Sequence, residues 1–326
     1  MVQYQRNKRA NEQKNKINSL TVVIATFNRA NSLKQCLNSL AGQTDAVFDI
    51  LILDGGSSDR TLEVIDAYRK QLAIRVIVDP TPHLSRIRDR LWREAKGDII
   101  ASIDDDVTVS KDWVRSIKRA FRENTNLGGV TGPTTIPGTL LKNRDVFLFH
   151  TTNNPFLRII GRVYIRLFMN GEYNAIGRIY PSGAWSPGSN FSASRKLPRP
   201  ISVDYLEACN YAIPKTILSE IGGYDHGYIG TSEWCEVDVA FRIRKKGYRL
   251  FFDKNIAVEH RVSRSGVFHR RHAGRERLNN FARFYISSYF PKSVKGWALF
   301  SLYFLAFSFY TVILSFNRGK KHTDEE

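Results

Sequence analysis

The first third of the chain alternates regularly between short apolar runs and amphipathic segments. The apolar runs cover residues 21–25, 50–53, 74–78 and 99–103. Continuous apolar runs of this length are typical of strands that are buried on both faces of a parallel sheet. The segments between them carry apolar residues every three or four positions, as amphipathic helices do. This order predicts an α/β fold whose strands are mainly parallel and joined by right-handed crossovers.

Acidic residues follow two of these predicted strands. Asp54 comes after the second run, and Asp104, Asp105 and Asp106 come directly after the fourth. Ligands of open α/β sheets bind beyond the carboxyl ends of the strands. Residues two apart in an extended segment point to the same side, so we expect Asp104 and Asp106 to address one ligand together. Their oxygens suit Mg²⁺ or Mn²⁺ held with a substrate diphosphate, whereas a solvated acidic turn is the alternative.

Composition excludes several classes of protein. The chain is 42% hydrophobic and 25% charged, which excludes a wholly disordered protein. Its three cysteines (Cys36, Cys209 and Cys235) have no short paired spacing, which excludes a disulfide scaffold and a cysteine zinc site. The formal charge of +18 favours anionic partners such as nucleic acid, phosphorylated small molecules or a membrane surface.

The two ends of the chain differ in character. Residues 1–19 form a basic polar tail, which we expect to be solvated, and residues 318–326 form a second charged tail. Residues 296–317 contain no charged side chain. A helix of this length spans about 33 Å, enough for a bilayer core of about 30 Å. This run therefore predicts a transmembrane helix. A buried core helix and a helix that lies on the membrane surface are the alternatives.

Two further segments have the composition of membrane-surface helices. Residues 262–295 are basic and rich in aromatic side chains, and they directly precede the uncharged run. Residues 155–169 place Arg158, Arg162 and Arg166 at every fourth position, in one stripe beside apolar residues. An amphipathic helix packed on the core explains this second segment equally well.

Four longer runs carry a resemblance to a known family. In order, they are VVIATFNRANSLKQCLNSL, ILILDGGSSDRT, LSRIRDRLWREAKGDIIASIDDDV and GGYDHGYIG with EVDVAFRIRKKGYRL. Together they resemble the family 2 glycosyltransferases, which are inverting enzymes with the GT-A fold, a Rossmann-like, mostly parallel sheet flanked by helices. The resemblance covers about residues 20–260. It implies a nucleotide-sugar-binding half over residues 20–106 and an acceptor and catalytic half over residues 107–261.

The resemblance implies a set of donor-binding residues. Thr26 and Asn28 match the loop after the first strand, beside the nucleotide. Asp54 matches the first acid of the family's Asp-Asp-Gly-Ser stretch, which contacts the base. Gly55 stands where the family has its second acid, so the choice of base stays open. Arg88 matches an arginine that lies near the nucleotide.

The resemblance also implies a metal site. Asp104 and Asp106 match the Asp-X-Asp motif, which binds ribose and a divalent cation, Mn²⁺ or Mg²⁺. Asp105 lies within this motif and is expected beside the donor. His260 matches a histidine that completes the metal site in some relatives, although a lone histidine is as often a surface residue.

The catalytic base implied by the resemblance is Glu236, two residues before Asp238. Cys235 stands where many relatives have an acid, so Glu233 and Asp238 remain alternatives. From the residues alone, Glu236 is better explained as an acidic residue stabilised at the N-terminus of a helix, and the resemblance is what favours the base.

Three arginines beyond residue 261 complete the predicted site. Arg264, Arg270 and Arg271 are expected to close over the donor diphosphate or to hold an acceptor phosphate. Attraction to membrane lipids would explain them as well.

Together with the uncharged run, the resemblance implies a membrane-anchored, metal-dependent, inverting hexosyltransferase. We expect it to move a sugar from a nucleoside diphosphate sugar to a hydroxyl or phosphate of a lipid-linked or glycan acceptor. The expected location is the cell membrane, with one pass and a catalytic domain on the cytoplasmic side, because Lys and Arg crowd the stretch before Gly296. Nucleic acid is not an expected partner, and the oligomeric state is open. The alternative is a non-catalytic, basic, membrane-associated protein that binds anions or nucleotides.

Overall fold

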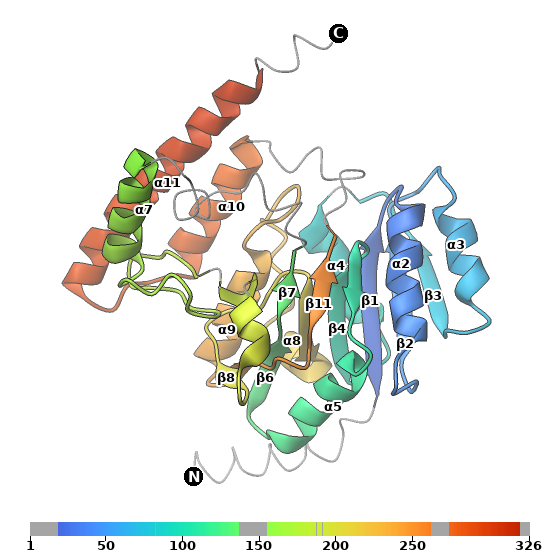
Figure 1. Cartoon of the computed structure of the whole chain (residues 1–326). Coiled ribbons are helices and arrows are strands. Elements are labelled where there is room, and N and C mark those ends of the chain that lie inside the picture. Colours follow the sequence, from blue (N-terminus) through green and yellow to red (C-terminus); the bar gives the residue numbers. More distant parts are fainter. Residues whose placement is uncertain are drawn as a thin grey trace.

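A computed structural model of the chain describes residues 19–81, 83–136, 155–186, 188–190, 192–261 and 274–319. A central sheet lies between helices in this structure (Figure 1). Helices α2 and α3 lie at one end of the molecule, and α7, α10 and α11 lie together at the opposite end. The bounds of these five helices are Ala30–Ala41, Thr61–Tyr68, Pro155–Phe168, Gly274–Ser287 and Val294–Gly319.

The larger sheet has eight strands in the order β3-β2-β1-β4-β9-β6-β10-β8. In that order their bounds are Ile74–Val78, Asp49–Asp54, Leu20–Thr26, Ile99–Asp104, Asn210–Pro214, Leu127–Thr131, Arg249–Phe252 and Ile201–Ser202. The first four strands in this order are parallel to one another, and β9 is antiparallel to both of its neighbours. The predicted α/β fold with a mostly parallel sheet is confirmed.

Successive residues of the parallel strands enter opposite sides of the sheet, and both sides are buried. In β1, Val22 and Ile24 join the core that contains α2 and α5 (Trp113–Glu123). Val23, between them, joins the other core, which contains α4 (Leu84–Glu94) and α9 (Cys235–Lys245). Because both faces need apolar side chains, the strands read as continuous apolar runs.

A second, three-stranded sheet has the order β5-β11-β7. The bounds are Val107–Val109, Val258–His260 and Thr134–Thr135. The antiparallel pairing of β5 and β11 sets His260 opposite Val107. The last residue of β11 therefore lies beside the turn that carries the three adjacent aspartates.

Helix α11 corrects one prediction. Within the described residues, no helix has both the length and the hydropathy needed to cross a membrane. The predicted transmembrane helix over residues 296–317 is therefore not supported. Polar side chains, among them Ser301 and Tyr303, interrupt the run, and Tyr303 is buried against the neighbouring helices. Part of this uncharged run packs on aromatic side chains of α10 and not on lipid. The ring centroids of Phe307 in α11 and Phe281 in α10 are 4.2 Å apart.

The predicted amphipathic helix over residues 155–169 is present as α7. The division into halves at residue 106 stays a prediction, because one continuous sheet runs through both. Part of the basic segment 262–295 and most of the two tails lie outside the described residues, as do Arg264, Arg270 and Arg271.

Candidate active site

The carboxyl ends of β1, β2 and β4 meet at one edge of the sheet. Thr26 pairs in register with Asp54, and Ala25 pairs with Asp104. Parallel pairing thus brings together three segments that are distant in the sequence. This edge is the one that the sequence predicts for a ligand.

Asp54 shapes the loop that follows β2. Its side chain is fully buried and accepts hydrogen bonds from the backbone N–H groups of Gly56 (3.2 Å) and Ser57 (2.9 Å). A Cβ atom on Gly55 would lie 3.2 Å from Phe27, so an acid at this position would crowd the side chain of Phe27. The structure therefore shows Asp54 holding its own loop, and its expected contact with a base stays a prediction.

Asn28 joins the same loop to the end of β1. Its backbone is in the left-handed region, with φ at 51°. Its backbone N–H donates to Ser57 Oγ at 2.8 Å, and its side-chain oxygen accepts from the backbone N–H of Ser58 at 2.8 Å. These hydrogen bonds connect the loop after β1 to the loop after β2, beside the aspartates that follow β4. Thr26, Asn28 and Asp54 are therefore neighbours, as the predicted donor site requires.

Asp105 contacts Thr26 and Arg29. It accepts a hydrogen bond from Thr26 Oγ1 at 2.8 Å and an ion pair from Arg29 at 2.7 Å. Burial raises the pKa of Asp105 to about 7, although Arg29 opposes this rise. Arg29 also lies 3.2 Å from Asp106, so one guanidinium balances two carboxylates. The sequence interpretation missed Arg29, although three adjacent acids signal the need for a nearby cation.

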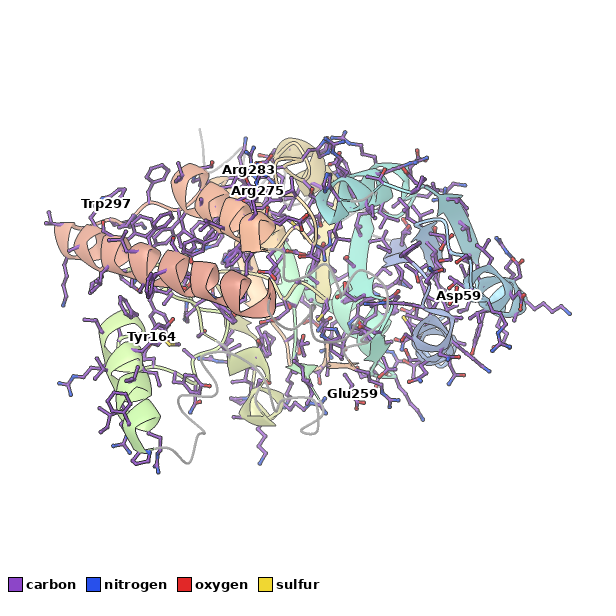
Figure 2. All side chains as sticks on the ribbon, turned by 90° about the horizontal axis from the view of Figure 1, so that it is seen from above. Asp59, Tyr164, Glu259, Arg275, Arg283 and Trp297 are labelled. Atoms are coloured by element: carbon purple, nitrogen blue, oxygen red, sulfur yellow. The ribbon has the colours of Figure 1, made fainter. Side chains whose placement is uncertain are left out.

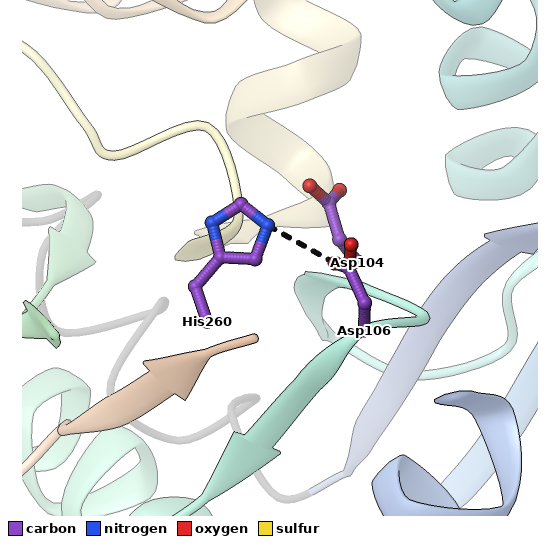
Figure 3. Close-up of side chains that lie close together, drawn as sticks. All are labelled: Asp104, Asp106 and His260. Atoms are coloured by element: carbon purple, nitrogen blue, oxygen red, sulfur yellow. Dashed lines mark ion pairs between the residues drawn. The ribbon is translucent and has the colours of Figure 1, made fainter. Parts of the chain in front are cut away.

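Asp104, Asp106 and His260 form a compact group at the edge of the sheet (Figure 3). Their potential ligand atoms all lie within 4.8 Å of one another. Asp104 and Asp106 therefore lie together, through the turn at Asp105 and Asp106 and not through the extended chain that was expected, and their binding of one ligand stays a prediction. Two carboxylates and an imidazole fit a divalent cation such as Mn²⁺, because hard oxygen donors dominate the set.

The imidazole of His260 is buried between an acid and a thiol. Its Nε2 atom lies 3.0 Å from Asp106 Oδ1, and its Nδ1 atom lies 3.7 Å from Cys209 Sγ. Burial by itself would lower the pKa of His260, but Cys209 and Asp106 together raise it well above its usual value. A proton and a metal cation would therefore compete for the imidazole nitrogen of His260.

Glu236 is buried at the start of α9 and forms an ion pair with Arg88 of α4. The other terminal nitrogen of Arg88 lies 3.8 Å from Asp104. Burial raises the pKa of Glu236, and the positive charge of Arg88 opposes this rise. One arginine thus connects the predicted base to the predicted metal site.

The two alternative bases have other partners. Asp238 pairs with Arg242 at 2.7 Å and accepts a hydrogen bond from Ser288, which follows α10. Glu233 pairs with Arg277 of α10 at 3.1 Å. Both acids thus tie the start of α9 to α10, and Glu236 is the one that Arg88 joins to Asp104.

The site can now be compared with known proteins. Residues 21–180 match the model of the family described as Glycosyl transferase family 2. The chain is 27% identical over 250 residues to the chondroitin synthase of Pasteurella multocida, an alignment that covers 73% of this chain and 23% of that protein. It is 33% identical over 105 residues to the validoxylamine A glucosyltransferase of Streptomyces hygroscopicus subsp. jinggangensis, with 31% of this chain and 25% of that protein covered. The chain thus spans about a quarter of the length of these curated relatives.

Solved structures of low sequence identity share the fold. S. aureus TarS 1–349 matches with a TM-score of 0.56 at 13% identity, covering 89% of this chain and 73% of that one. The mannosyltransferase PcManGT from Pyrobaculum calidifontis, solved in complex with GDP-Man and Mn²⁺, matches with a TM-score of 0.55 at 14% identity, covering 100% of this chain and 83% of that one. The fold is therefore α/β and GT-A-like. Taken with the family match, these findings support a glycosyltransferase of family 2.

Proposed function

We propose that this protein is an inverting, metal-dependent hexosyltransferase that uses a nucleoside diphosphate sugar as donor. One observation carries this proposal: Arg88 joins a buried carboxylate, Glu236, to the group of Asp104, Asp106 and His260 at the ligand edge of the sheet. One-step transfer from a diphosphate donor requires a cation group and a base in one site, and here a single arginine contacts both.

The donor would lie along the loops after β1 and β2. Thr26, Asn28 and Asp54 hold these loops rigidly beside the aspartates, so a nucleotide would meet a preformed surface. Structural neighbours were solved with UDP-GlcNAc and with GDP-Man, which supports a nucleotide sugar as donor here. Asp104, Asp106 and His260 would hold Mn²⁺ or Mg²⁺, which neutralises charge on the departing diphosphate when bound.

Glu236 would accept the proton of the acceptor hydroxyl. A carboxylate with a raised pKa is a stronger base than an ordinary glutamate, and such proton transfer contributes about 10²–10⁴-fold to a rate. Arg88 lies between Glu236 and Asp104, so its guanidinium can turn toward a bound diphosphate and leave Glu236 free. Displacement by the acceptor with no protein nucleophile inverts the anomeric centre.

The acceptor would be a glycan or a lipid-linked sugar with a free hydroxyl or phosphate. The similarity to a protein named chondroitin synthase supports a growing polysaccharide as one such acceptor. We also propose the cytoplasmic face of the cell membrane as the location, because anionic lipids there attract a chain with a net charge of +18.

A transfer assay with a panel of nucleotide sugars tests this proposal. Full-length protein is incubated with each UDP- and GDP-sugar, Mn²⁺ and a mixture of oligosaccharide acceptors, and the products are identified by mass spectrometry. We expect one donor to be consumed, with transfer abolished by chelator and by Glu236→Gln. Tight binding of nucleotides without release of sugar from any donor would contradict the proposal and favour a non-catalytic anion-binding protein.

A further inference from the structure

Helices α7 and α11 lie at the end of the molecule opposite α3 (Figures 1 and 2), and both carry large exposed apolar side chains. On α7, Ile159 and Val163 are each 58% exposed. On α11, Leu305 and Phe309 are each 68% exposed. Further exposed apolar residues on the two helices are Ile160, Leu167, Trp297 and Leu302. Large apolar patches on a protein surface mark sites of interaction.

The inner faces of the same two helices are already packed. Phe168 of α7 lies 5.6 Å from Tyr303 of α11 between ring centroids, and Phe281 of α10 lies 5.1 Å from Phe304. Ile165, Phe168 and Tyr303 are buried in the core. Rotation of either helix would expose these rings, so the outward direction of the apolar residues is determined by the fold.

A stripe of arginines borders the apolar face. Arg158, Arg162 and Arg166 are exposed and follow one another at every fourth position of α7. Arg162 and Arg166 also line a cleft of about 1050 Å³, together with Asn170, Glu172 and Arg178. The exposed surface of α7 thus has a row of apolar side chains with a row of arginines next to it.

The charges indicate which partner this face suits. Neither α7 nor α11 contains an aspartate or glutamate. A second copy of the chain would therefore bring arginines against arginines, which is unfavourable. An anionic bilayer provides both a lipid phosphate layer for the arginines and an apolar layer for the residues between them.

We propose that the outer faces of α7 and α11 bind peripherally to a membrane surface that contains anionic phospholipid. The apolar residues enter the boundary between headgroups and acyl chains. Arg158, Arg162 and Arg166 bind lipid phosphates, and the cleft beside Arg162 takes one headgroup. Binding of this kind needs no spanning helix, and it goes beyond the proposed transfer reaction.

Co-sedimentation with lipid vesicles tests the proposal. Full-length protein is mixed with vesicles of phosphatidylcholine alone, or of phosphatidylcholine and phosphatidylglycerol in equal parts. We expect binding to the mixed vesicles, weakening as NaCl rises from about 0.1 M to about 1 M. Arg162→Glu with Arg166→Glu should weaken the partition coefficient by about 30-fold or more. Ile159→Ser with Leu305→Ser should weaken it by about tenfold or more.

Matched controls lie on α3, α5 and β3 and the residues beside them, outside α7 and α11. Lys70→Glu with Arg122→Glu makes the same change in net charge, and Leu62→Ser with Val78→Ser removes apolar side chains that are 41% and 58% exposed. Both controls should bind the mixed vesicles as the wild type does. Nucleotide binding and circular dichroism should be unchanged in all four variants, so this test is independent of the transfer reaction.

Three results would overturn the proposal. The first is equal binding by the face variants and the control variants. The second is inhibition by free inorganic phosphate at a concentration whose ionic strength has no effect as NaCl, because this would indicate a site for a soluble anion. The third is a vesicle-free dimer that Ile159→Ser with Leu305→Ser converts to a monomer, because this would assign the apolar face to self-association.

Discussion

Arg88 of α4 and Glu236 of α9 form a buried ion pair. The two residues are far apart in the sequence: 147 positions already separate Arg88 from Cys235, the neighbour of Glu236. Both side chains are only 6% exposed. Arg88 also lies 3.8 Å from Asp104 and donates to Cys235 Sγ at 3.3 Å. Arg88 therefore influences the pKa of Glu236 and also contacts Asp104 of the predicted cation site.

Glu236→Gln should lower kcat by about 10²–10⁴-fold, because the amide cannot accept the acceptor's proton. The variant should still bind the donor, because the loops of Thr26, Asn28 and Asp54 are held by hydrogen bonds that do not involve Glu236. Stopped-flow transfer and nucleotide titration measure the two quantities separately. Asp238→Asn is the matched control: it should lower stability, through loss of the ion pair to Arg242, more than it lowers kcat. Full turnover by Glu236→Gln would exclude Glu236 as the base.

Arg88→Met should destabilise the protein, because it leaves the Glu236 carboxylate buried without a counter-charge. Breaking a buried pair from one side lowers the free energy of unfolding by roughly 3–5 kcal/mol. Adding Glu236→Gln to Arg88→Met should recover part of this loss, because no buried charge then remains unpaired. Urea denaturation of the two single variants and the double variant measures the coupling. Additive losses would show that the two side chains do not interact in solution.

The rate of transfer should rise with pH through the pKa of Glu236. Burial raises that pKa above the usual glutamate value, so the midpoint of kcat should lie above about 4.3. Arg88 holds the pKa down, so Arg88→Lys, which keeps a positive charge at a longer distance from Glu236, should move the midpoint further upward. The pH dependence of kcat at constant Mn²⁺ tests this. A midpoint that falls when Arg88 is replaced would contradict the assignment.

Cation binding should release a proton from His260. Cys209 and Asp106 raise the pKa of the ring well above its usual value, so the ring keeps its proton to a higher pH than an ordinary histidine does. A metal needs the neutral imidazole, so affinity for Mn²⁺ should increase as pH rises toward that pKa. Calorimetry in two buffers of different ionisation enthalpy counts the protons released. His260→Asn should remove this proton; unchanged release in that variant would assign it to another group.

Local patterns were sufficient to predict the edge of the sheet where the candidate site lies. The apolar runs that become β1, β2 and β4 are continuous because both faces of the sheet are buried, and the acids that follow them must then meet at one edge. Asp104 and Asp106 were also expected to lie together, and they do, although Asp105 and Asp106 form a turn after β4 and not extended chain. These features depend on neighbours in the sequence.

Partners that lie far apart in the sequence were less predictable. Arg29 balances Asp105 and Asp106 across 76 and 77 positions, and nothing in its own segment signals that role. The uncharged run over residues 296–317 satisfies the pattern of a membrane span, yet its aromatic rings pack on Phe281 of α10. Residue type alone cannot distinguish lipid from aromatic side chains as the partner of an apolar helix face.

Mn²⁺ binding to matched aspartate variants tests the central claim most directly. Asp106 faces the group with Asp104 and His260, whereas its neighbour Asp105 faces Thr26 and Arg29. In an electron paramagnetic resonance titration with Mn²⁺ and UDP or GDP, Asp106→Asn should weaken Mn²⁺ binding by at least about tenfold, and Asp105→Asn should change it much less. Equal affinity in the wild type and Asp106→Asn would contradict a cation site at this edge and, with it, the proposed transfer.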